Sequence, residues 1–439
     1  MKFFFSIFLI SIPISFAYID PGTGGYLLSS LWTSFIGFMA LLFGIILRFF
    51  RHTLMNFLKI VYREHKVKLF LIILSVLFII FQLFFVQAQK TDLIDFREGV
   101  LINNLESEDY FLYQEGLFLT NGSLIKNWSY SYLPFIDSEG FYYAQEYYES
   151  ENWGKFHFNG TLIWIKPDKI HHEIYETQNN TIVTMTKDVH VYNGREVEFD
   201  VILEYNKNGT LIERFSLWDH LEEFQKWHNK LELDKPKNII LPENHRKENK
   251  SIWGGYYDYY HLNSFSEVPR NKREGLHPAF TPGNWILSFR HGSMIFILDQ
   301  NTKEILWRGI YDQIENNLEG QHAPQMNSNG DIIVFDNGRY REYSRIITIN
   351  PITLSVIENY VASDFFTGSQ GYVQSLSNGN LFITESEEGR IFEINTSGNI
   401  IWEYQKPVLG GRENTSKTEL EIYRSYKYDK EFIDSLMEE

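Results

Sequence analysis

The chain has 439 residues, a formal net charge of −16, a sequence pI near 5.3 and no cysteine. The acidic balance argues against nucleic acid as a partner, because binding phosphate requires a basic surface. The lack of cysteine excludes disulfides, thiolate metal sites and a cysteine nucleophile. Aromatic residues make up 17% of the chain, which favours a large β-rich body.

The N-terminal ninety residues have the pattern of a membrane anchor. Residues 1–17 have one early lysine, an apolar core and a small-residue ending, so they are either a secretory signal or an extra transmembrane segment. Apolar stretches at about 26–47 and 69–86 are long enough to cross a bilayer, and the basic segment 48–68 between them is expected to be cytoplasmic. The sequence therefore predicts a two-helix transmembrane hairpin in the lipid bilayer within 18–90. The alternative is a buried helical hairpin of a soluble domain.

Eight N-x-[ST] sequons follow this region, as expected of an external, glycosylated domain. Because the chain is rich in asparagine, several of them are also expected by chance. The sequon asparagines are Asn121, Asn127, Asn159, Asn179, Asn208, Asn249, Asn395 and Asn414.

Beyond residue 95 one pattern recurs: an apolar strand, a turn with Asn and Gly or their equivalents, and a second apolar strand. Most copies are spaced by about 40–50 residues, the spacing of four-stranded propeller blades. The six copies occupy 116–128, 155–166, 202–215, 294–307, 345–360 and 390–404.

An inner pair of strands precedes these hairpins, most clearly at GNWILSFR (283–290), NGDIIVFD (329–336) and NGNLFITE (378–385). The period predicts an all-β fold, a six-bladed β-propeller preceded by the transmembrane hairpin. We expect the propeller to occupy 91–410, with an insertion at 216–250 and a charged C-terminal tail at 411–439.

Two histidines are the main candidates for chemistry. In a propeller the first strand of each blade lines a central channel, so equivalent positions in different blades meet near the axis. His261 in DYYHLNSF (258–265) and His322 in QHAP (321–324) occupy such positions, and we expect them to face one another. A single strand histidine is more commonly structural. With His291 they could ligate a metal, but no carboxylate recurs at the matching position, so we expect no metal and no cofactor.

Polar residues around these histidines are further candidates. Arg339 and Arg341 follow the Asp-Asn-Gly turn of FDNG, where guanidinium groups could hold a sulfate, phosphate or carboxylate. A solvated charged loop is the alternative. Walker, G-x-S-x-G and H-E-x-x-H motifs are missing from the sequence. Residues that could contact substrate or support the site are Asn263, Arg290, His291 and Asn337.

Taken in order, the segments DYYHLNS, SFRHGSMIFILD, QHAP, FDNG and YSR resemble the arylsulfotransferase (aryl sulfate sulfotransferase) family over about 255–405. The resemblance implies a six-bladed propeller that moves a sulfuryl group from an aryl sulfate to a phenol through a histidine. It also implies that His261 and His322 are channel histidines, and that Arg339 or Arg341 is the arginine that follows FDNG. Positioned cationic donors suit a group that carries diffuse negative charge.

The chain departs from the family at one point. The family's nucleophilic histidine lies in the blade after FDNG, whereas residues 368–394 contain no histidine. Either His261 or His322 has taken that role, with His322 our candidate, or the chemistry is altered or lost. The alternative function is a non-catalytic surface propeller that binds a glycan, peptide or protein partner. In both cases we expect a protein of the cell membrane with its propeller on the extracytoplasmic side.

Overall fold

The computed structural model describes residues 98–147, 150–226, 237–238, 257–310, 313–314, 317–408 and 417–438. The predicted signal segment, the transmembrane hairpin and its basic loop lie outside these ranges. Within the described ranges, no helix is long and apolar enough to cross a membrane.

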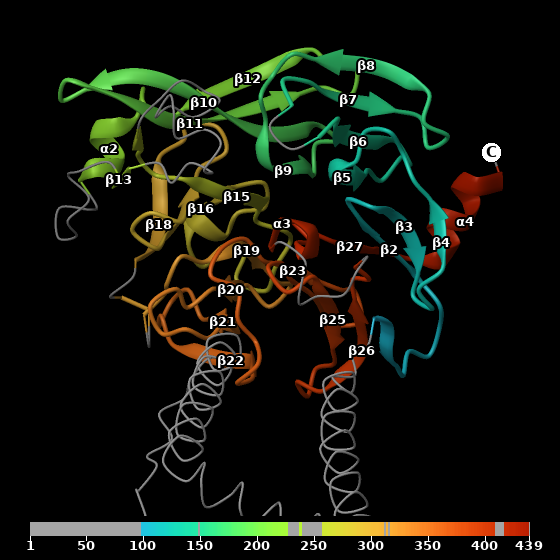
Figure 1. Cartoon of the computed structure of the whole chain (residues 1–439). Helices are drawn as coiled ribbons and strands as arrows, with labels where there is room; N and C mark the ends of the chain where they lie inside the picture. Colours follow the sequence, from blue (N-terminus) through green and yellow to red (C-terminus); the bar gives the residue numbers. More distant parts are fainter. Residues whose placement is uncertain are drawn as a thin grey trace, which may run out of the picture. The chain divides into compact units, whose positions relative to one another are not determined.

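Six sheets, antiparallel except for the parallel pair β11–β14, lie around a common centre and form the blades of a propeller (Figure 1). In blades two to six the first of the four consecutive strands lies nearest the centre. Blades two, three and four contain β5 (Tyr132–Ile136), β6 (Tyr142–Gln145), β7 (Trp153–Phe156), β8 (Leu162–Lys166), β9 (His171–Glu176), β10 (Ile182–Tyr192), β11 (Arg195–Tyr205), β12 (Leu211–Ser216), β15 (Leu262–Glu267), β16 (Trp285–Phe289), β17 (Met294–Leu298) and β18 (Ile305–Ile310).

The later blades follow the same order. In blade six, β1 pairs with β26 as a fifth strand, and in blade three β14 pairs with β11 and β13 with β14. These strands are β19 (His322–Met326), β20 (Ile332–Asp336), β21 (Arg345–Ile349), β22 (Val356–Val361), β23 (Tyr372–Ser375), β24 (Leu381–Glu385), β25 (Arg390–Ile394), β26 (Ile400–Gln405), β1 (Gly99–Asn103), β13 (Lys237–Asn238) and β14 (Tyr257–Asp258).

The predicted all-β, six-bladed propeller is confirmed. Each of the six predicted hairpins is the outer strand pair of one blade; for example, 155–166 is β7–β8 and 390–404 is β25–β26. The short helices are α2 (Leu221–Gln225), the 3-10 helix η1 (Pro278–Phe280), α3 (Lys417–Leu420) and α4 (Lys430–Glu438).

The first blade is completed by the C-terminal end of the chain. Its strands are β2 (Tyr110–Tyr113), β3 (Gly116–Leu119) and β4 (Leu124–Lys126), and its innermost strand is β27 (Tyr426–Tyr428). The main chain of Lys427 also exchanges hydrogen bonds with the Gln374 amide of blade six, at 2.7 and 3.0 Å. The segment that the sequence suggested to be a charged tail therefore closes the ring. Its Tyr-Lys-Tyr stretch is too short and too polar to stand out as a strand by alternation alone.

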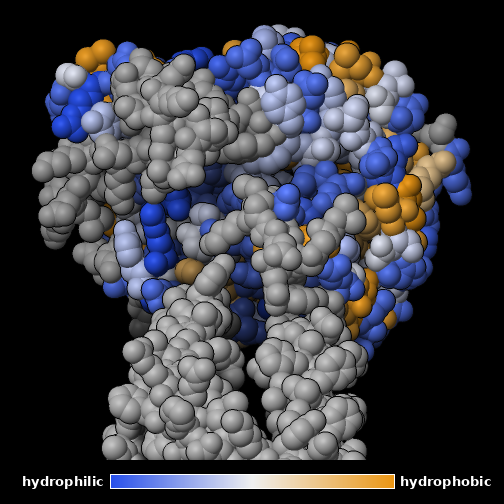
Figure 2. Space-filling model, in the orientation of Figure 1, coloured by the Kyte–Doolittle hydropathy of each residue, from blue (hydrophilic) through white to orange (hydrophobic). Residues whose placement is uncertain are grey.

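Hydrophobic side chains fill the spaces between blades. Both faces of a middle strand such as β16 or β17 are buried, because each blade packs on a neighbour on either side. The outermost strands instead expose apolar residues, including Leu124, Leu162 and Ile212. Figure 2 shows hydrophobic residues as separate patches among hydrophilic ones on the face in view. The sequon asparagines Asn121, Asn127, Asn159, Asn179 and Asn208 are exposed.

Candidate active site

Three imidazoles from three consecutive blades gather at the starts of the inner strands. His172 from β9 lies between the two predicted histidines, with ring centroids 5.0 Å from His261 and 6.5 Å from His322. His261 comes just before β15, and His322 is the first residue of β19. The two predicted histidines thus share one site, with His172 between them.

A repeated backbone distortion places these side chains. Five non-glycine residues at the starts of inner strands adopt left-handed conformations, with φ between 49° and 62°. Strand pairing skips next to four of them, as in a β-bulge, which redirects side chains at the end of a strand. Such strain at matching positions is typical of functional sites. When the inner strands are aligned on these left-handed residues, His261 matches His172. His322 does not match them, because it lies one position before Ala323, the left-handed residue of its blade. The five residues are Leu133, His172, His261, Ala323 and Gln370.

Asn337 fixes the tautomer of His322. The Asn337 amide nitrogen donates to the carbonyl oxygens of Thr367 and Gln370, at 2.9 and 2.7 Å. Its Oδ1 therefore faces Nδ1 of His322 at 2.7 Å, so Nδ1 must carry the hydrogen and Nε2 keeps its lone pair. Burial, with the nearby charge of Arg290, lowers the pKa of His322 to about 3. The ring is therefore neutral and has an available nucleophilic nitrogen.

The tautomers of His172 and His261 are also fixed by hydrogen-bond partners at Nδ1. His171 donates from Nε2 to the Thr186 carbonyl at 3.2 Å, so its Nδ1 accepts the Nδ1 hydrogen of His172 at 2.5 Å. Nδ1 of His261 faces the Asp258 carboxylate. Burial lowers the pKa of both His172 and His261 well below the ordinary value. Each of the three imidazoles thus has its Nδ1 hydrogen fixed by a hydrogen-bond partner.

A buried polar network supports the strand that carries His322. Gln321 is fully buried and donates to the Phe289 and Met294 carbonyls. Asn263, also fully buried, donates to the Gln321 carbonyl at 2.7 Å. The predicted site residues Asn263 and Asn337 therefore position His322 through hydrogen bonds.

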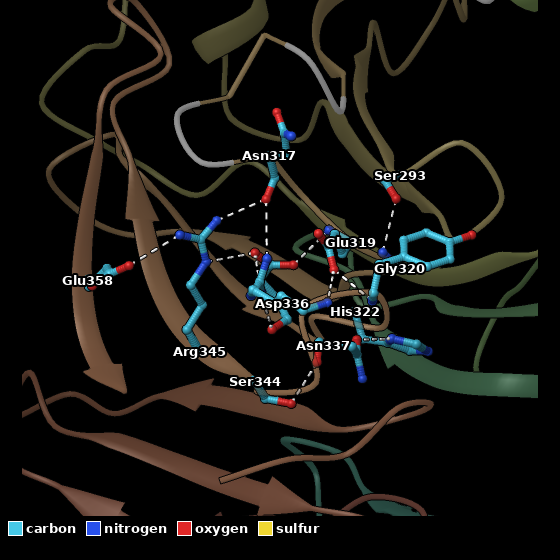
Figure 3. A network of polar contacts seen from close by, with 12 residues as sticks. Ser293, Asn317, Glu319, Gly320, His322, Asp336, Asn337, Ser344, Arg345 and Glu358 are labelled. Atoms are coloured by element: carbon cyan, nitrogen blue, oxygen red, sulfur yellow. Dashed lines mark hydrogen bonds and ion pairs between the residues drawn. The ribbon is translucent and has the colours of Figure 1, made fainter. Parts of the chain in front are cut away.

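The turn after β20 is held by two carboxylates (Figure 3). Asp336 accepts from the Arg345 guanidinium at 2.8 Å and from the Glu319 main chain at 2.8 Å. Glu319 accepts the main-chain N–H groups of Tyr340 and Arg341. Gly338 has φ +70°, and a Cβ there would collide with the Tyr343 carbonyl. These contacts explain the FDNG motif as a rigid turn that follows the strand.

Two arginines beside this turn form no ion pair with the part of the chain that the structure describes. Arg290 and Arg339 flank Gly320, whose added Cβ would meet them at 3.9 and 4.0 Å. Burial, together with the charge of Arg339, lowers the pKa of Arg290, and Arg290 Nε is buried without a hydrogen-bond acceptor. These two guanidinium groups repel one another, and one of them has an unsatisfied donor. An anion bound between them would reduce the repulsion and accept that hydrogen bond.

Arg341 is placed differently. Its guanidinium lies 2.8 Å from the fully buried Asp336 carboxylate, so it is part of the network that shapes the turn. Between the two arginines that the sequence left open, Arg339 is the one with a guanidinium available to a ligand.

A buried charged cluster lies behind His261. Lys187 Nζ lies 2.9 Å from Asp258 and 3.4 Å from Glu198. Burial alone would raise the pKa of Asp258, but the Lys187 ammonium and His261 hold it well below the usual range. Burial raises the pKa of Asp200, which lies in the same cluster. Asp258 is therefore an ionised acceptor that orients His261.

Among the described residues, one group has the arrangement of a metal site: Asp258, His261 and His291, whose ligand atoms all lie within 4.8 Å of one another. The Lys187 ammonium already neutralises Asp258, and a divalent cation there would be repelled by it. His291 directs Nδ1 to the Tyr259 carbonyl at 3.2 Å. The contacts favour an Asp–His pair over a metal centre.

Sequence reasoning missed His172, Lys187 and Asp258 as members of the site. His172 stands beside another histidine at the start of HHEIYE, in a blade where the family motifs are not evident. His172 could have been identified by aligning the inner strands of blades three and four, because it then matches His261.

The fold and the site together define a class: a six-bladed β-propeller with neutral histidines at the starts of its inner strands and two arginines just after the second strands of blades four and five. The family model described as arylsulfotransferase (ASST) matches residues 143–407. The chain belongs to this family. A search of curated protein sequences finds no match.

Solved structures with a similar fold have low identity to this chain. A Bacteroides caccae protein of unknown function is 12% identical, with a TM-score of 0.41, covering 73% of this chain and 99% of its own. A catalytically inactive virginiamycin B lyase from Staphylococcus aureus, with quinupristin, is 11% identical, with a TM-score of 0.36, covering 71% and 76%. A luciferin-regenerating enzyme is 10% identical, with a TM-score of 0.38, covering 76% and 96%. Likeness at this level carries no information on function.

Proposed function

We propose that this chain transfers a sulfuryl group from an aryl sulfate to a phenolic acceptor, with His322 as the nucleophile. The observation that carries the proposal is the position of Arg290 and Arg339, two guanidinium groups that form no ion pair with any described residue, near a neutral imidazole whose tautomer is fixed. Family membership supports sulfuryl transfer as the class of reaction, and Arg290, Arg339 and His322 are our candidates for its site in this chain.

The arginines hold the oxygens of the transferring group. A sulfate oxygen accepts well from a guanidinium, and an anion between Arg290 and Arg339 relieves their repulsion. Because these donors are positioned before substrate arrives, they stabilise the charge that builds up on the sulfuryl oxygens and on the leaving oxygen.

In the first half-reaction, the Nε2 lone pair of His322 attacks the sulfur atom. A nitrogen–sulfur bond forms, the sulfur–oxygen bond to the aryl group breaks, and the aryl oxygen leaves with the bonding electron pair. That oxygen takes up a proton from water. The products are a phenol and a sulfuryl group on His322.

In the second half-reaction, His261 acts as the base. Its Nε2 takes the proton of the acceptor phenol, and Asp258 stabilises the imidazolium that results. The phenol oxygen attacks sulfur, the nitrogen–sulfur bond breaks, and its electron pair returns to Nε2 of His322. His261 then releases its proton to water, and the chain is ready for another donor.

The test is to trap labelled sulfate on the protein. We expect 4-nitrophenyl [³⁵S]sulfate to label the wild type and a His157→Gln control, because His157 is an exposed histidine of blade two. His322→Gln should not be labelled and should have no turnover. Label that persists in His322→Gln would assign the nucleophile elsewhere, and absence of label and turnover in the wild type would refute the transferase.

One observation favours a second candidate, a non-catalytic propeller that binds a glycan, peptide or protein. Residues 368–394 contain no histidine, and Ser369 and Gln370 stand at the inner-strand start of blade six. This alternative predicts that the wild type binds a partner but releases no phenol from any aryl sulfate.

Membrane attachment is a separate part of the proposal and rests on the sequence. Apolar spans at 26–47 and 69–86 and the basic segment 48–68 support a propeller held on the extracytoplasmic side. In intact cells, protease added outside should remove the propeller, whereas a tag inserted in 48–68 should stay protected. Protection of the propeller would overturn this orientation.

A further inference from the structure

The inner-strand starts divide into two chemical halves. Blades three, four and five contribute the imidazoles of His172, His261 and His322. Blades one and two contribute the phenol rings of Tyr423 and Tyr132, which lie 5.2 Å apart by ring centroid. Tyr423 also lies 6.1 Å from His172, at a near edge-to-face angle of 61°. The aromatic half therefore adjoins the imidazole half through His172.

The ring-closing segment is firmly anchored next to Tyr423. The Ile422 N–H donates to the Ser386 carbonyl at 3.0 Å, and the Tyr423 carbonyl accepts from the Ser386 hydroxyl at 3.2 Å. Arg424 is buried, pairs with Glu173, and lies 4.2 Å above the Tyr372 ring. The position of Tyr423 is thus set by its neighbours on both sides.

Both tyrosines are half-buried and keep part of their surface accessible. Phenol rings held at such an angle offer faces and edges on which another aromatic ring can pack, at separations of about 4.5–7 Å. Both lie outside residues 143–407, the part that matches the family. The family-matched region supplies the histidines and arginines, and the flanking regions supply the aromatic side chains.

We propose that Tyr132 and Tyr423 form the wall that holds the aromatic ring of the substrate and selects aryl sulfates over alkyl sulfates. The inference rests on the proposed function. It places the sulfuryl group against Arg290, Arg339 and His322, and places the attached ring across His172 against the two tyrosines. These tyrosines are positioning residues and take no part in breaking or forming bonds.

The experiment measures the dissociation constants of 4-nitrophenyl sulfate and methyl sulfate by calorimetry, using full-length protein. We expect the wild type to prefer the aryl ligand, and Tyr423→Leu and Tyr132→Leu each to reduce that preference about three- to tenfold. Their affinity for methyl sulfate should stay unchanged. Tyr423→Phe retains the ring and should retain the preference.

Tyr360→Leu is the matched control, because Tyr360 is also half-buried and packs on Phe365 and Phe392, at 5.2 and 5.1 Å, away from the site. It should keep the wild-type preference. The proposal would be refuted if the leucine variants lost affinity for both ligands equally, or if Tyr360→Leu lost the preference. It would also be refuted if the wild type preferred neither ligand or bound neither. A wild type that shows the preference but no turnover would refute the transferase and leave the wall standing.

Discussion

Arg339 and Arg341 are two positions apart on one turn, yet the Arg341 guanidinium lies 2.8 Å from the buried Asp336 carboxylate, whereas Arg339 is exposed and forms no ion pair with the described residues. The same short sequence thus supplies one arginine to the fold and leaves the other exposed, as our proposal for the sulfuryl group requires. The difference arises because Glu319 binds two consecutive main-chain N–H groups, of Tyr340 and Arg341, and fixes the direction of the turn.

Replacing these two arginines should have different effects. Arg339→Met removes a donor to the sulfuryl oxygens and should lower kcat by about 10²–10³-fold, as loss of an oxyanion donor does. Arg341→Met leaves Asp336 with fewer donors and should cost about 1–3 kcal/mol of unfolding free energy, with turnover retained in the folded protein. Steady-state kinetics and urea unfolding of both variants check this. The reverse pattern would make Arg341 the substrate arginine.

Asn337→Leu should impair the reaction by freeing the His322 ring. Without Oδ1 as acceptor, the Nδ1 hydrogen is no longer specified, and part of the population carries it on Nε2, where it blocks attack. We expect kcat to fall about 10- to 100-fold with little change in KM, the size seen for outer-shell partners of histidines. Asn284→Leu is the control, because Asn284 is equally buried but donates to Pro278 and Ala279 far from the site. Equal turnover in both variants would refute the tautomer argument.

Stability should fall as the pH drops below about 6.5. Burial lowers the pKa of His322 to about 3, so between these values the unfolded chain binds a proton that the folded chain does not. The stabilising effect of a neutral His322 is therefore present above its unfolded pKa and is lost as the pH falls. His322→Gln should reduce the slope of unfolding free energy against pH by up to about 1.4 kcal/mol per unit between pH 5 and 6. Urea titrations at fixed pH values measure this slope, and identical slopes would show that His322 is protonated in the folded protein.

Lys187→Met should be among the most destabilising single changes. Only 5% of the Lys187 side chain is exposed, and it neutralises Asp258 and Glu198. Removing one partner of a buried ion pair costs about 3–5 kcal/mol, because charges remain uncompensated. Lys169→Met should change stability by no more than about 1 kcal/mol, since its partner Glu151 is 73% exposed. Chemical denaturation of both variants makes the comparison, and similar small effects would mean that water reaches the cluster.

Much of the fold could be predicted from the sequence, because the outer hairpins repeat one local pattern. Each has an apolar strand, a turn and a second apolar strand, and the spacing of the copies gives the number of blades. The closure by β27 could not be found in this way. A three-residue strand that pairs with β2 at the other end of the domain has no local signal, because its partner determines it.

Site residues that belong to a sequence motif could be predicted. Site residues that depend on packing between distant parts of the chain could not. His261 and His322 stand in recognisable segments, whereas Asp258–Lys187 is a contact between blade three and the residues before β15. The division between Arg339 and Arg341 depends on which guanidinium reaches Asp336, and spacing along the chain does not determine that distance. His172 could have been found only by aligning the inner strands with one another.

The closure of the ring also has a consequence for synthesis. Strand β2 is translated long before its partner β27, so the first blade has an open edge on the ribosome until residues 426–428 emerge. Tyr423 and Arg424 come with the same segment. A nascent chain can form most blades in order, but Tyr423 joins the imidazoles only once the segment that contains β27 has been made. If the proposed wall binds the aryl ring, binding of an aryl sulfate would therefore report that β2 and β27 have met.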